Sequence, residues 1–198
     1  MKNSIRFLIL IIVLFFYGGC IEQKVLPYPT HYIISEPKII KSKKFINKSI
    51  KIMLPKAKPS LKSIGILYTK AKKEISSYNK SVWADKPVVL LYSHIYKTLL
   101  FSDAFRVILP QNSQALSDYI LESDLLNLRQ DFYNNKAKLL LEVKFDLIDM
   151  DKKEAVISKL FRYKIECDKN AKGAIKATNE AFDSLSYDLI KWIEENDI

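Results

Sequence analysis

Residues 138–148, KLLLEVKFDLI, and residues 155–165, AVISKLFRYKI, decide the fold of this chain of 198 residues. In the first stretch every second residue from Leu139 to Leu147 is apolar, and charged residues lie mainly between them. The second stretch repeats this alternation after a turn of mostly charged residues at 149–153. Because side chains alternate between the two faces of a strand, this period of two indicates an antiparallel sheet with one apolar and one solvated face.

Two further segments have the three- and four-residue spacing of apolar side chains that is typical of an amphipathic helix. One covers residues 86–104, with Asp85 as a candidate N-cap and Pro87 in the first turn, where a missing N–H costs little. The other covers residues 172–194 near the end of the chain. The stripes are Val88, Leu91, Ile95 and Leu99 in the first, and Ile175, Thr178, Phe182, Leu185, Leu189 and Trp192 in the second.

Shorter apolar segments predict additional strands. These are residues 50–54, 63–69, 105–109 and 117–133, with residues 31–34 as a candidate edge strand. Two helices against one face of a mainly antiparallel sheet make a two-layer α+β sandwich. The chain is long enough for one domain with a substantial apolar core.

The first twenty residues, MKNSIRFLILIIVLFFYGGC, have the order of segments that marks an export signal. A basic segment, an apolar segment at residues 7–17 and two glycines precede Cys20. The apolar segment is too short to span a bilayer, which takes about 20 residues. The arrangement resembles the lipobox of a bacterial lipoprotein, although Tyr17 stands where an aliphatic residue is usual. We therefore expect a lipoprotein signal peptide at residues 1–19 and acylation of Cys20; the alternative is an ordinary secretory signal.

The residues after the signal predict two regions. Residues 20–47 contain three prolines and are expected to form a lipid-anchored tether, whereas residues 48–198 are expected to form the folded domain. Ile21 follows the cysteine, where Asp would favour retention at the inner membrane. The sequence therefore favours the outer membrane, with the domain facing the periplasm.

Charge is unevenly distributed along the chain. Residues 37–73 hold twelve lysines and no acid, whereas residues 74–198 hold 17 basic and 20 acidic residues. The lysine-rich region either lies on anionic headgroups or is a solvated face. An exported lipoprotein would not meet nucleic acid, and the lysines are not interleaved with an aromatic stacking platform, so we expect no nucleic-acid partner.

Residues for catalysis or metal binding are scarce. The two histidines, His31 and His94, are far apart in the sequence, and His94 lies between apolar helix residues, as expected of a satisfied interfacial histidine. Cys167 ends an alternating apolar run and is expected to be a small core residue, while Asp149 and Asp151 fit a hairpin turn. With four glycines and no phosphate loop, metal-ligand spacing or nucleophile elbow, the sequence predicts no enzyme, no cofactor and no metal site.

One constellation has a specific resemblance. An aliphatic strand ending in Tyr68 is followed by Tyr78, Trp83 and Ala84, then by Pro87 at the helix start and by the FRV of the next predicted strand. This order resembles the ABC-type transport auxiliary lipoprotein family, which includes lipoproteins of the paraquat-inducible and other Mce-type lipid transport systems. The likeness runs from the strand at Tyr32 to the helix at Trp192, and Asp85 and Lys86 depart from the usual acid and proline.

The resemblance implies an accessory role rather than catalysis. Such a lipoprotein would dock the Mce-domain protein, a hydrophobic periplasmic conduit, at the outer-membrane end and aid lipid passage. The implied fold is similar to the N-terminal domain of TolB. The implied contact residues are Tyr78, Trp83, Lys80 and Lys86, although both aromatics would also fit a core role. A lipopolysaccharide-assembly lipoprotein, an activator of peptidoglycan synthesis and homo-oligomerisation are left open.

If Cys20 is the acylated N-terminus of the mature protein, Cys20→Ser blocks lipid labelling and releases the domain from the membrane fraction. Metabolic labelling with a fatty-acid analogue, followed by cell fractionation, measures both effects. Labelling that persists in the variant would show that the anchor lies elsewhere.

Overall fold

The structure, a computed structural model, describes residues 28–71 and 74–196, in which the chain forms nine strands, two α-helices and one short 3-10 helix. The candidate signal peptide and Cys20 lie outside these residues. In chain order the elements are β1 (Thr30–Tyr32), β2 (Ile46–Ile52), β3 (Lys56–Ala57), η1 (Pro59–Lys62), β4 (Gly65–Ala71), β5 (Glu74–Trp83), α2 (Pro87–Ser102), β6 (Phe105–Leu109), β7 (Tyr119–Tyr133), β8 (Lys136–Asp149), β9 (Glu154–Cys167) and α3 (Ala171–Glu194).

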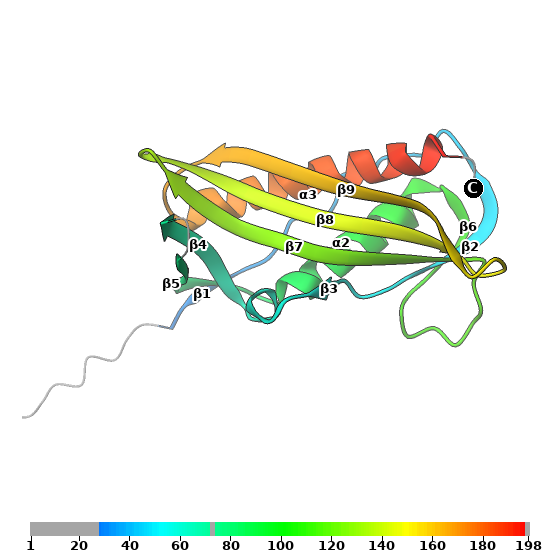
Figure 1. Cartoon of the computed structure of the whole chain (residues 1–198), viewed down its shortest axis with the longest axis horizontal. Coiled ribbons are helices and arrows are strands. Elements are labelled where there is room, and N and C mark those ends of the chain that lie inside the picture. Colours follow the sequence, from blue (N-terminus) through cyan, green and yellow to red (C-terminus); the bar gives the residue numbers. More distant parts are fainter. Residues whose placement is uncertain (1–27, 72–73, 197–198) are drawn as a thin grey trace, which may run out of the picture.

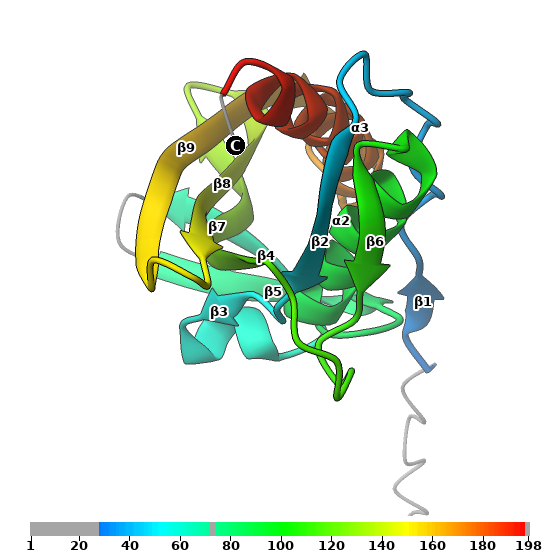
Figure 2. The same ribbon diagram turned by 90° about the vertical axis from the view of Figure 1, so that its right-hand side faces the viewer.

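The strands form one curled sheet around β7 (Figures 1 and 2). β7 pairs antiparallel with β8, which pairs antiparallel with β9, so the three longest strands form a meander. On its other side β7 pairs in parallel with β2, β3 and β4, and β2 continues in parallel to β6. β4 and β5 form an antiparallel hairpin, and β1 adds to β5 in parallel.

The apolar face of the meander forms the centre of the core. All five alternating residues of β8 from Leu139 to Leu147 are at most 2% exposed. β7 follows the same alternation until a bulge between Leu125 and Asn127 adds one residue. The bulge turns Leu126 to solvent, 41% exposed, and returns Leu128 to the core.

α3 packs against β8 and β9 of the meander, and α2 packs against α3, β2 and β6, so both helices bury their apolar stripes in one core (Figure 2). Every stripe residue expected in the two helical segments is buried. Phe145 of β8, Phe161 of β9 and Trp192 of α3 join the layers through ring contacts with centroid separations of 5.8–6.4 Å. The expected α+β class, with two helices on an apolar sheet face, is therefore confirmed.

Three details of the sequence prediction are corrected. Several pairings are parallel, so the sheet is mixed, although the three long strands and most paired residues are antiparallel. Tyr78 and Trp83, which none of the predicted strands includes, lie in strand β5 (Glu74–Trp83). Asp85 does not cap α2, because Lys86 occupies the N-cap position and no side-chain capping bond is present there.

Residues 33–45, which we call the strap, cross the two helices instead of forming a free tether. The strap begins after β1 and ends at β2, and β2 itself starts at Ile46, so the expected boundary at residue 47 falls inside a strand. Pro37 is buried, and Ile34 and Ile40 pack against the core. For the described part of residues 20–47, the structure therefore replaces the expected tether with an integral part of the domain.

Gly173 allows the first turn of α3 to approach the end of β9. A Cβ at this position would lie 2.4 Å from the carbonyl oxygen of Asp168 and 2.7 Å from its backbone nitrogen. The Asn170 side chain caps the helix by accepting from the Gly173 N–H at 2.8 Å. The tight connection between β9 and α3 therefore has no room for a side chain here.

Gly173→Ala should lower the free energy of unfolding by about 1–3 kcal/mol, the usual cost of overpacking. Helix propensity alone would raise the free energy of unfolding by roughly 1 kcal/mol. A decrease would therefore show that the close approach of β9 to α3 outweighs helix propensity. Urea denaturation measures the difference, with the exposed neighbour Lys172→Ala as the control that changes little. A more stable Gly173→Ala variant would mean that β9 and α3 are not packed this closely.

Candidate functional site

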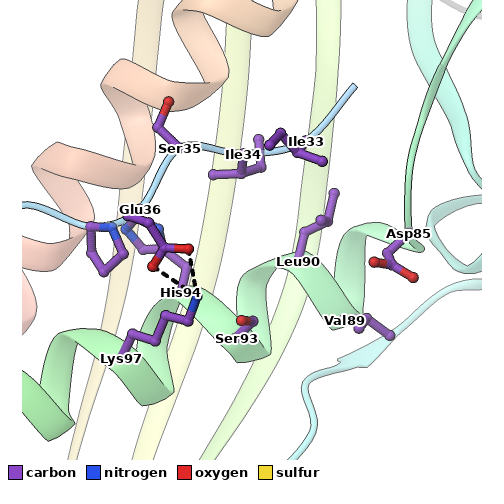
Figure 3. Close-up of a pocket in the computed structure, with 11 residues that line it drawn as sticks. Ile33, Ile34, Ser35, Glu36, Asp85, Val89, Leu90, Ser93, His94 and Lys97 are labelled. Atoms are coloured by element: carbon purple, nitrogen blue, oxygen red, sulfur yellow. Dashed lines mark hydrogen bonds and ion pairs between the residues drawn. The ribbon is translucent and has the colours of Figure 1, made fainter. Parts of the chain in front are cut away.

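A groove lies between the strap and the N-terminal half of α2 (Figure 3). Its volume is about 270 Å³. Apolar side chains of the strap, Ile33 and Ile34, face Val89 and Leu90 of α2 across it. Ile33 is 72% exposed and Val89 is 38% exposed, so the groove presents apolar surface to solvent. We call this feature the strap groove.

Polar contacts fix the strap over both helices. The Ser35 backbone N–H donates to Asn179 Oδ1 of α3 at 2.7 Å. Lys97 of α2 donates to both carboxylate oxygens of Glu36, at 2.6 and 2.7 Å. Lys38 reaches Asp183 of α3 at 3.0 Å. These partners are more than 60 residues away in the sequence, and they hold one wall of the groove in place.

The rim of the strap groove is polar and mostly acidic. Glu36 and Lys97 neutralise each other at one end (Figure 3). Asp85 lies at the other end, is exposed, and has no ion-pair partner among the described residues. The groove therefore combines apolar walls with one uncompensated carboxylate, which suits a protein segment with apolar side chains and a nearby base.

His94 lies beneath the groove and is 4% exposed. Its Nε2 is 3.1 Å from the Phe182 carbonyl oxygen and 2.8 Å from Ser186 Oγ. Burial lowers the pKa of the imidazole, while the hydrogen bond to Phe182 and the charges of Asp183 and Glu36 act in the opposite direction. The expectation of a satisfied histidine at a helix interface agrees with this geometry.

The contact between His94 and Ser186 does not form a nucleophile and base. His94 and Ser186 are both buried, so their contact does not open onto a space in which a substrate could meet the serine oxygen. Ser186 is 1% exposed, and its hydroxyl also bonds to Thr98 Oγ1 at 2.8 Å. The group is a buried polar link between α2 and α3.

The structure separates the four predicted contact residues into two pairs. Trp83 is 2% exposed and packs with Ile66, Ala174 and Ile175, which favours its core interpretation. Tyr78 is half-buried and its hydroxyl hydrogen-bonds to Gln130 at 2.5 Å.

Lys80 on β5 and Lys86 at the N-cap of α2 are both exposed. Lys86 follows Asp85 in the sequence, and Asp85 lines the strap groove whereas Lys86 does not. A contact role therefore stays a prediction for the two lysines.

Other candidate sites resolve into structural contacts. Cys167 is half-buried beside the core, burial raises the pKa of its thiol, and Gln130 Nε2 lies 3.2 Å from its sulfur. Among residues 28–71 and 74–196 no group of three potential ligands could hold a metal ion. In the same residues no helix is long and apolar enough to cross a membrane.

Sequence reasoning missed the strap groove. The strap residues are charged or exposed at most positions, and the contacts that hold them come from distant helices. The only local signal is the spacing of Ile34, Pro37 and Ile40, three residues apart, which face the core. Three residues at this spacing do not show which helices or strands the strap packs against.

Comparison with known proteins shows a shared fold. The sequence matches no family model and no curated protein. A crystal structure of a protein from Xanthomonas campestris, assigned to the family DUF330, is similar with a TM-score of 0.69 and 17% identity, covering 83% of this chain and 91% of that one. The crystal structure of an uncharacterized protein has a TM-score of 0.66 and 12% identity, covering 84% and 99% of the two chains. At these identities the likeness defines the class of fold.

The buried neutral His94 should make stability depend on pH. Its pKa is lowered in the folded state, so the unfolded chain binds more protons as the pH falls below about 6.5. The free energy of unfolding should be highest above this pH and decrease toward pH 5. Urea denaturation across this range measures the slope, and His94→Gln should reduce it. An equal slope in the variant would show that other groups cause the dependence.

Proposed function

We propose that this chain is a lipid-anchored accessory protein of an Mce-type ABC lipid transport system. The observation that carries the proposal is the fold likeness to a DUF330 protein over 83% of the chain, because DUF330 is the family of the paraquat-inducible auxiliary lipoproteins. The lipobox-like sequence before Cys20 is independent support. In this proposal the protein is held at the outer membrane and docks the transport conduit from the periplasmic side.

The proposed role is non-catalytic. The histidine and serine that come closest to a catalytic pair are both buried and bonded to one another and to the helix backbone. In the strap groove the Ser93 hydroxyl makes no hydrogen bond to Glu36, Asp85 or His94, so no activated nucleophile is formed there. The walls of the strap groove provide a concave apolar surface, and Asp85 provides one carboxylate without an ion-pair partner among the described residues. These are features of a docking surface.

We further propose that the strap groove contributes to the contact with the Mce-domain protein. Ile33 and Val89 are large apolar residues left exposed on facing walls, and Asp85 gives the rim a charge to pair with a partner's base. Lys86 lies beside this rim. Exposed apolar residues in a pocket are the type of anchor that dominates binding energy at interfaces.

Ile33→Glu should weaken capture of the Mce-domain protein by roughly tenfold or more, since truncating a central anchor costs about 2 kcal/mol. The matched control is Ile39→Glu, because Ile39 is 68% exposed on the same strap and does not line the groove. Both acylated proteins are compared by affinity capture and mass spectrometry, with thermal melts to exclude unfolding.

Two results would contradict the proposal. Equal capture by the Ile33→Glu and Ile39→Glu variants would place the contact outside the strap groove. Capture of an outer-membrane barrel or a peptidoglycan synthase, with no Mce-domain protein, would replace the proposed function altogether.

A further inference from the structure

The direction of β1 determines the end of the domain at which the described chain begins. β1 runs parallel to β5, with Thr30 opposite Ser81 and Tyr32 opposite Trp83. The start of β1 therefore points toward the end of β5 at which Glu74 lies. Nine residues lie between Cys20 and Thr30, so the Cα atoms of these two residues are at most about 35 Å apart.

Two hairpin tips lie at this same end of the molecule (Figure 1). Thr69 of β4 pairs with Asp131 of β7, so the β4–β5 tip lies beside the β7–β8 tip. The second tip is a tight turn in which Tyr133 pairs with Lys136 and both intervening asparagines have positive φ, 45° and 60°. The turn presents its side chains on a defined backbone.

A hollow of about 660 Å³ opens on the outer face of the sheet beside this turn. Lys136, Lys138 and Lys164 line it together with Leu140 and Tyr133. Tyr133 is 66% exposed. Ile75, in the adjacent hairpin, is 48% exposed. An aromatic ring and an aliphatic side chain among lysines are the combination found at membrane interfaces.

The acidic side chains around the hollow are paired with basic or hydroxyl groups of the protein, whereas some of its lysines are not paired with acids in the described part of the chain. The Asp131 carboxylate is held by Arg129 at 2.7 Å and by Thr69 at 2.8 Å. Glu142 is paired with Arg162 at 3.2 Å.

Lys138 reaches Glu166 at 3.5 Å, with both side chains exposed. Lys136 and Lys164 have no acidic partner among the described residues. The acids near the hollow are therefore largely neutralised by the protein, while two lysines are left for an external anion.

The lysines of residues 37–73 do not provide an equivalent surface. Lys38, Lys41, Lys48 and Lys56 pair with acids from later elements, at 2.6–3.3 Å. Their charge is distributed over the strap, β2 and β3 and is partly neutralised there. The solvated interpretation fits this region better than a membrane-binding face.

We propose that the hollow lined by Lys136, Lys138 and Lys164, with Tyr133 at its edge, binds anionic lipid headgroups of the membrane that carries the anchor. The surface holds the domain with its two hairpin tips against the bilayer. The proposal rests on the anchor at Cys20 for its biological setting, but the binding itself needs no acyl chain. Failure of the anchor and failure of this surface are therefore separable.

The test uses the mature chain, residues 20–198 with Cys20→Ser, which keeps every residue of the apolar core. Flotation is measured with vesicles of phosphatidylcholine alone and with vesicles that also contain phosphatidylglycerol. We expect flotation only with the anionic vesicles, and loss of flotation at high salt. Lys136→Ala with Lys164→Ala should lower the partition coefficient by roughly 30-fold, the effect of two surface lysines.

The control removes two positive charges at the opposite end, by Lys43→Ala with Arg106→Ala. It should change the partition coefficient only slightly. Equal losses in both double variants, or equal flotation with neutral vesicles, would overturn the proposal. The proposal would also be overturned if the protein with all three lysines failed to float with anionic vesicles while the Lys136→Ala, Lys164→Ala variant lost capture of the Mce-domain protein, because the surface would then belong to a protein partner.

Discussion

The pairing of β7 with four other strands is the constraint on which the rest of the structure depends. Its antiparallel contact with β8 starts the apolar face that buries α2 and α3, and its parallel contacts place β2, β3 and β4. A one-residue slip of β7 would turn its apolar residues to solvent. The bulge after Leu125 adds one residue to β7 without shifting its apolar residues to the solvent face. Leu128 therefore still reaches the core.

The same pairing connects the fold to the proposed function. β4 is placed by β7, β5 by β4, and β1 by β5, so the direction in which the chain leaves the domain follows from β7. The strap then runs from β1 across both helices to β2, and one of its edges forms the strap groove. The start of β1, the basic hairpin end and the strap groove are thus placed by one series of strand pairings.

The sequence predicts those elements in which the apolar residues recur with the period of a strand or a helix. The alternation around Val143 and the stripe through Phe182 each identify a buried face, and both are found as expected. β5 was missed because six of its first seven residues are exposed, and backbone pairing with β4 and β1 defines the strand. The strap groove was missed for a similar reason, since Glu36 depends on Lys97, 61 residues away. Parallel strand pairing and ion pairs between distant residues produce no repeating pattern in the sequence, so they cannot be predicted from it.

The central claim is that the topology orients the anchored domain with its hairpin end on the membrane. A nitroxide label at Asn134, in the β7–β8 turn, is compared with one at Asp151, in the β8–β9 turn, in acylated protein on vesicles containing phosphatidylglycerol. Power saturation with a lipid-attached nickel chelate reports the distance of each label from the bilayer surface. The account predicts strong relaxation at Asn134 and little at Asp151. Equal relaxation at the two labels, or stronger relaxation at Asp151, would contradict it.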